Sequence, residues 1–293
     1  MLTITTGRGE LSALDWLIDP FQAEFLRTGA LAAMAVGVLC CVVGSYVILR
    51  GMALMADSLA HGVLPGVAIA FVLTAGDAGD APNQLAISLG ALAAGLVTAG
   101  ATGAILRRTR LREETATGVV FVFMLALGVV IVSRVEGYTV DLSSFLFGDV
   151  LGVDPSEALT TALLAAAVLA LVAALYRPFL LISFDRQRAA ALGLPVDRLH
   201  LVMLVLISLA VVVGFRVVGA LLVLGLLIAP PAAAALVTRR LPAMMAVSAG
   251  IAAASAPLGL LLSWHLDIAA GASIVLVAVS AFVALLVVSP RRT

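Results

Sequence analysis

The sequence contains no lysine: all 17 basic residues are arginine, 17 acids balance them, and the formal net charge is +0. Without excess positive charge the chain lacks the electrostatic basis for binding nucleic acid, so we expect no nucleic-acid partner. Charged residues make up only 12% of the chain and hydrophobic residues 63%, which excludes an ordinary soluble protein. The composition therefore predicts a polytopic membrane protein.

Motifs of enzymes are also missing. The chain has no HExxH zinc motif, no GxSxG nucleophile motif and no GxxxxGK[ST] phosphate loop. We therefore expect a chain that is not an enzyme and does not hydrolyse ATP through a loop of its own. The only two cysteines, Cys40 and Cys41, are neighbours in an apolar run, where we expect them to pack as small apolar residues. No cleavable signal peptide is evident, and residues 11–27 have the mixed pattern of an interfacial helix.

Long apolar runs dominate the rest of the chain, and runs of about 20 residues are typical of transmembrane helices. The predicted fold class is all-α, with an interfacial segment at 1–24, one transmembrane domain at 25–289 and a tail at 290–293. The pattern gives nine segments: 25–49, 53–73, 85–106, 116–133, 157–176, 199–215, 217–237, 242–263 and 267–289. The count becomes eight if Pro65 and Gly66 make 53–73 a broken or re-entrant helix. The sixth and seventh segments require a tight turn near 214–216.

The arginines indicate the orientation. With nine spans and the first running inwards, 13 of the 17 arginines are cytoplasmic, as the positive-inside rule requires. On this topology 12 of the 17 acids lie outside or at the outer interface. An acidic outer mouth would concentrate cations, but outer loops that merely lack basic residues would give the same pattern.

Asp57 and His61 are the ionisable residues that stand out within a span. Residues at i and i+4 share a helix face, so both side chains reach one point. A carboxylate with a neutral imidazole suits Mn²⁺, Fe²⁺ or Zn²⁺. The other interpretations are an ion pair within the helix, or Asp57 as a helix cap near the cytoplasmic interface. His200 and His265 lie at span ends, where we expect interfacial residues rather than ligands.

Two further features are irregular. Pro230 and Pro231 interrupt the hydrogen bonds of an apolar helix, either as an ordinary kink or where the backbone lines a cavity. The segment 183–194, in the long loop 177–200, has the pattern of a short helix, in which Ser183 caps and Gly193 ends the helix. This helix is either an interfacial connector or a docking element for a cytoplasmic partner.

The stretch GMALMADSLAHGVLPGVAIAF (51–71) resembles the signature of the permease subunits of zinc and manganese ABC importers. VVGALLVLGLLIAPPAAAALVTRRL (217–241) resembles a second block of that family, and 141–151 and 184–199 follow its order. The likeness extends over about residues 20–289. One departure is Ala56, since the family usually has glycine before the aspartate.

The resemblance implies a homodimer of permease subunits in the cell (plasma or inner) membrane, two cytoplasmic ATPase subunits and an extracytoplasmic metal-binding protein. It implies that Asp57 and His61 coordinate metal in the pore and that the polar helix docks on the ATPase. The docking residues would be Phe184, Asp185, Arg186, Arg188, Ala190, Leu192 and Gly193.

We therefore expect a permease that carries Mn²⁺ or Zn²⁺, with Fe²⁺ also compatible, and no permanently bound cofactor. The breaks at Pro65, Gly66, Pro230 and Pro231 would line or shape the pathway. A permease for iron chelates or cobalamin has no need of the ligand pair. An ion-coupled secondary transporter would work without an ATPase, but the chain lacks a convincing internal repeat.

Overall fold

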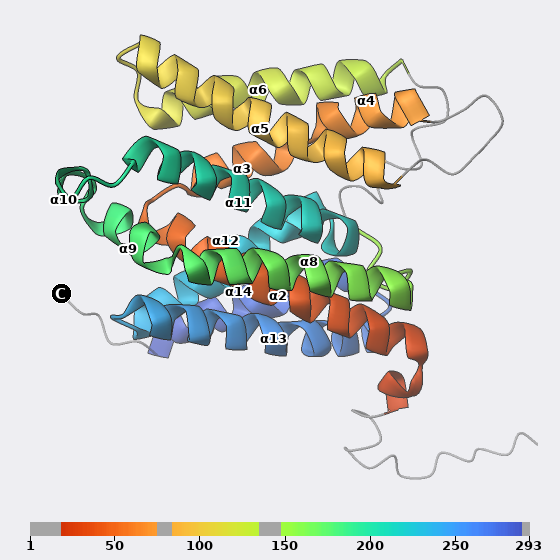
Figure 1. The fold of residues 1–293 in the computed structure, drawn as a ribbon. Helices are drawn as coiled ribbons and strands as arrows, with labels where there is room; N and C mark the ends of the chain where they lie inside the picture. Colours follow the sequence, from red (N-terminus) through yellow and green to blue (C-terminus); the bar gives the residue numbers. More distant parts are fainter. Residues whose placement is uncertain (1–18, 75–83, 135–147, 289–293) are drawn as a thin grey trace, which may run out of the picture.

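The computed structural model describes residues 19–74, 84–134 and 148–288, which form helices joined by turns, without a strand (Figure 1). Most of segment 1–24 and the tail 290–293 lie outside this part. The elements are η1 (Asp19–Gln22), α2 (Glu24–Leu49), α3 (Ala53–Gly62), α4 (Leu64–Thr74), α5 (Gln84–Arg108), α6 (Glu113–Val132), α8 (Pro155–Ala174), α9 (Tyr176–Phe184), α10 (Arg186–Ala191), α11 (Val196–Val218), α12 (Ala220–Val237), α13 (Leu241–Leu266) and α14 (Ala270–Val288). The predicted all-α class is confirmed.

All nine apolar segments are helical where they are described. Among the described residues, eight spans are long and apolar enough to cross a membrane, including Ala53–Thr74, which joins α3 and α4. The remaining segment is the apolar helix α12, Ala220–Val237. The structure thus contains the expected segments.

The helices lie roughly side by side, so the connections gather at two ends of the bundle (Figure 1). The connections α2–α3, α5–α6 and α12–α13, together with α10, lie at one end, at the left of Figure 1. The starts of α2 and α8 and the turn between α11 and α12 lie at the other. The arginine-rich connections thus share one end, which we call the arginine-rich end, and this is the arrangement that the positive-inside rule requires.

Labelling tests which end faces the cytoplasm. Arg110 and Arg188 are exposed at the arginine-rich end, and Asp154 is exposed beyond the opposite end of the helices. In a chain with Cys40 and Cys41 replaced, we expect Arg110→Cys and Arg188→Cys to resist a membrane-impermeant thiol reagent in intact cells, and the control Asp154→Cys to react. Reaction of the cysteine at position 110 or 188 before lysis would show that the arginine-rich end faces outwards, contrary to the prediction.

Helix α2 is the centre of the packing and contacts α8, α11, α12 and α13. Small residues make these approaches close, as is typical of helices in membranes. A Cβ on Gly37 would lie 3.1 Å from the Cβ of Ala252, and one on Gly44 would overlap the carbonyl oxygen of Leu227. Helices α3, α4, α5 and α6 pack mainly on one another; α5 and α3 join this group to α11, and α3 also contacts α12.

The tight turn between α11 and α12 is at Gly219, and the expected position at 214–216 was wrong. Gly219 has φ +84°, which glycine adopts without steric cost. Gly214 lies inside α11, where a Cβ would be 2.7 Å from Val223 and 2.9 Å from Val36. Both glycines are therefore structural, but only Gly219 turns the chain.

Candidate metal site and docking segment

Asp57 and His61 lie on α3, with Nδ1 of His61 3.2 Å from Oδ1 of Asp57. If each atom bound one ion at about 2.1 Å, this separation would correspond to a ligand–metal–ligand angle of about 100°, between octahedral and tetrahedral values. Nδ1 also lies 3.2 Å from the backbone oxygen of Asp57. The pair is thus compatible both with metal binding and with a contact inside the helix.

The pair opens onto the surface of the chain. The side chain of His61 is 19% exposed and that of Asp57 is 36% exposed, while their neighbours Ser58, Leu59 and Ala60 are fully buried. The ring of Phe121, on α6, meets the imidazole edge-to-face at 5.6 Å. Among the described residues no group of three or more His, Cys, Asp or Glu is placed to hold a metal ion. Further ligands of these four residue types would therefore have to come from outside the described part of this chain.

The expected break after this pair is present, but it lies at Val63 rather than at Pro65 and Gly66. Pro65 belongs to the first turn of α4, where its missing N–H is tolerated. That N–H would otherwise bond the carbonyl of His61, so the helix is interrupted just beyond the candidate ligands. A Cβ on Gly66 would overlap Gly90 of α5, which explains the glycine by close contact rather than by a break.

The second irregularity is not a break: α12 continues from Ala220 to Val237 through Pro230 and Pro231. Each proline removes the N–H that would bond the carbonyl four residues earlier, at Leu226 and Leu227. The thiol of Cys41 donates to the Leu226 oxygen at 3.4 Å, and the Leu227 oxygen lies against Gly44. Helix α2 thus accommodates both freed carbonyls, and Cys41 does more than the small apolar packing that we expected.

We expect Cys41→Val to destabilise the protein by about 1 kcal/mol relative to Cys40→Val, because it leaves a buried carbonyl unpaired. Both thiols are fully buried, so the two variants are matched in size and burial. Cys41→Ser keeps a donor and should recover part of the loss. Thermal unfolding in detergent measures the difference, and equal melting temperatures for the two valine variants would contradict the role of the thiol.

The polar segment forms α10, a single short helix after α9. Asp185 caps it, since its Oδ1 accepts from the Arg188 N–H at 2.8 Å. The cap expected at Ser183 was wrong: Ser183 lies inside α9 and donates to the carbonyl of Phe179. Gly193, with φ +79°, follows the helix as predicted.

The surface of this segment suits a contact with another protein. Phe184 is 70% exposed and Leu192 63% exposed, and both lie outside the candidate membrane spans. Ala190 and Arg188 are exposed, whereas Ala189 is fully buried and anchors α10. Arg186 bonds Asp197 of α11 at 2.9 Å, which connects the segment to a span.

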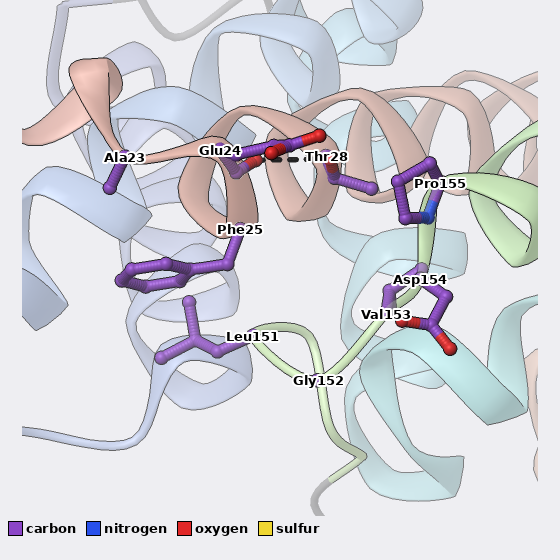
Figure 2. Close-up of a pocket in the computed structure, with 9 residues that line it drawn as sticks. All are labelled: Ala23, Glu24, Phe25, Thr28, Leu151, Gly152, Val153, Asp154 and Pro155. Atoms are coloured by element: carbon purple, nitrogen blue, oxygen red, sulfur yellow. Dashed lines mark hydrogen bonds between the residues drawn. The ribbon is translucent and has the colours of Figure 1, made fainter.

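At the opposite end of the bundle a pocket of about 520 Å³ lies between the starts of α2 and α8 (Figure 2). Glu24 and Asp154 line it, with Phe25 and Leu151 forming an apolar wall. A second pocket shares Phe25 and includes Asp267. These acids lie where the sequence placed an acidic mouth. Asp77, Asp80, Glu136 and Asp141, which belong to the same prediction, lie outside the described residues.

Comparison with known proteins gives the family. A profile of the ABC 3 transport family matches residues 22–289. The chain is 39% identical to the manganese transport system membrane protein MntC of Halalkalibacterium halodurans, over 96% of this chain and 94% of that protein. It is 34% identical to a probable iron transport system membrane protein of Haemophilus influenzae, over 95% and 98% respectively.

A solved structure described as PsaBC from Streptococcus pneumoniae in complex with Fab is similar, with a TM-score of 0.83, 34% identity, and 95% of this chain and 97% of that chain covered. The resemblance inferred from the sequence is confirmed, and the protein is a multi-pass membrane protein, with eight candidate spans in the part of the chain that the structure describes. The chain belongs to the ABC 3 transport family.

Proposed function

We propose that this chain is the permease subunit of an ATP-driven importer of a divalent transition metal, with Mn²⁺ as the principal substrate and Zn²⁺ or Fe²⁺ as competitors. The observation that carries the proposal is the Asp57–His61 pair, held at 3.2 Å on a span and open to one side. Bare carboxylates in spans cost about 3 kcal/mol on insertion scales, so a charge-compensating ligand is needed. The relatives named for manganese support the choice of metal.

The permease works as a homodimer in this proposal. One chain supplies two ligands, which is short of the four or more that these cations take. If α3 and its copy face a common axis, two aspartates and two histidines close the shell. The partial exposure of both side chains supports this arrangement, because a partner surface is able to reach them.

Two cytoplasmic ATPase subunits would contact Phe184–Gly193, and an extracytoplasmic metal-binding protein would deliver the ion at the opposite end. The exposed Phe184 and Leu192 support the first contact, and the negative charges of Glu24 and Asp154 in the pocket at the opposite end support the second, because they would attract an arriving cation. ATP hydrolysis would then switch access to the pair by moving α10 against α11.

Transport by the reconstituted complex tests the function. Proteoliposomes that contain the permease, its ATPase and its binding protein should accumulate Mn²⁺ only with internal ATP, and excess Zn²⁺ should compete. Uptake driven by an ion gradient without ATP would instead indicate a secondary transporter. Uptake of a chelate with no uptake of free metal would indicate a chelate permease.

A further inference from the structure

A cavity of about 540 Å³ lies at the arginine-rich end between α5, α10 and α11, and the proposed transport cycle assigns it no ligand. Helices α5 and α11 touch at Gly95, where a Cβ would be 3.1 Å from Oγ of Ser208. Towards the arginine-rich end they enclose the cavity, and Gly100 and Gly103 of α5 line it. A Cβ on either glycine would meet no atom within 4 Å, so these residues leave the space open. The volume is in the range of small-molecule sites.

The rim of the cavity is basic. Arg107 lies in the last turn of α5 and Arg198 in the first turn of α11, and neither has an ion-pair partner among the described residues. The third arginine of the lining, Arg186, is already paired with Asp197, which leaves Glu113 as the one remaining carboxylate. Nδ1 of His200, also in the lining, is buried without a hydrogen-bond partner in the described structure. The rim therefore favours an anion.

The rest of the wall is apolar, and part of it is exposed on the side of a span. Leu106, Leu201 and Leu204 line the cavity, and Leu201 is 50% exposed although it lies in a span. A free anion gains nothing from this wall, whereas a lipid has an acyl chain to lay along it. Basic pockets between spans near the interface are a recurrent way to bind lipid headgroups. We propose that this cavity binds the headgroup of an anionic phospholipid, with Arg107 and Arg198 holding the phosphate.

The cavity is not an exit for the transported cation. Met55 is the residue of α3 that lines the cavity. Asp57, two residues further along α3, is rotated by about 200° around the helix axis from Met55. A cation leaving Asp57 would also have to enter a lining with more arginines than carboxylates. The lipid site thus lies on a different side of α3 from the candidate metal site, and it does not depend on the proposed substrate.

Lipid binding to the purified permease–ATPase complex tests the proposal. We expect native mass spectrometry to find phosphatidylglycerol, but not phosphatidylcholine, retained by the unchanged complex. The variant Arg107→Gln/Arg198→Gln should bind phosphatidylglycerol at least about tenfold more weakly, since each basic residue near the surface contributes to the attraction. The control Arg239→Gln/Arg240→Gln removes the same charge next to the α12–α13 connection and should bind normally.

Gly103→Leu puts an apolar side chain into the cavity without a change of charge, from a position where a Cβ meets no atom within 4 Å, so it should also weaken phosphatidylglycerol binding. Equal binding by the Arg107/Arg198 variant and the Arg239/Arg240 control would overturn the proposal. Displacement of the lipid by millimolar inorganic phosphate would overturn it as well, in favour of a soluble-anion site. Unchanged binding in Gly103→Leu would place the lipid outside the cavity.

Discussion

Asp57→Asn and His61→Ala should each reduce Mn²⁺ uptake at least about a hundredfold, while the complex with the ATPase still assembles. Asparagine keeps the size of aspartate but removes the charge, and a neutral amide is a far weaker ligand for a divalent cation. His61→Ala removes the nitrogen that lies 3.2 Å from the carboxylate. Metal bound to the purified complex should fall in parallel, as measured by elemental analysis.

Glu114→Gln is the matched control, because it removes one exposed carboxylate outside the apolar core of the spans and should leave uptake unchanged. The double variant Asp57→Asn/His61→Gln separates metal binding from a mere ion pair within α3. If the two groups only neutralise each other, removing both charges together restores neutrality, and uptake survives. Near-normal uptake by the double variant would reject the metal site, and loss of uptake would support it.

The helices could be predicted because each span needs about 20 apolar residues, and these residues follow one another in the sequence. Details of the turns could not, because they depend on neighbours distant in sequence. Gly214 and Gly219 both suit a turn, but only the packing of Val223 and Val36 against Gly214 shows which one stays helical. Ser183 and Asp185 are both residue types that cap helices. Because α9 extends to Phe184, Ser183 lies inside that helix and Asp185 is the cap of α10.

The candidate site shows the same division. Asp57 and His61 were identified from their i, i+4 spacing, which is a local property of a helix. Phe121 and Cys41 were missed as part of the surroundings, because no local pattern shows that α6 packs on α3 or that α2 covers the carbonyl of Leu226. A hint did exist for Cys41: Pro230 must free a carbonyl, and a buried donor is needed to satisfy it. If a second copy of the chain supplies the remaining metal ligands, the sequence of one chain does not show which residues come together around the ion.

The docking segment carries the other large expected effect. Arg188→Glu and Ala190→Trp should each reduce metal-stimulated ATP hydrolysis about tenfold or more, because they put an opposite charge or a bulky ring on the exposed surface of α10. Arg186→Glu should act as well, since it also replaces the attraction to Asp197 by repulsion and so loosens α10 from α11. Metal binding at Asp57 and His61 should persist in all three variants.

The comparison of these variants distinguishes a contact from a general disturbance. Ala189 lies on the buried face of the same helix, so Ala189→Trp should lower the melting temperature of the permease, whereas Ala190→Trp should not. Arg240→Glu serves as the charge control, because Arg240 is exposed just before α13 and should leave hydrolysis unchanged. Unchanged metal-stimulated hydrolysis in the Arg186, Arg188 and Ala190 variants would show that α10 is not the ATPase contact. Loss of hydrolysis with retained metal binding and stability would place the coupling between the two subunits at this exposed helix.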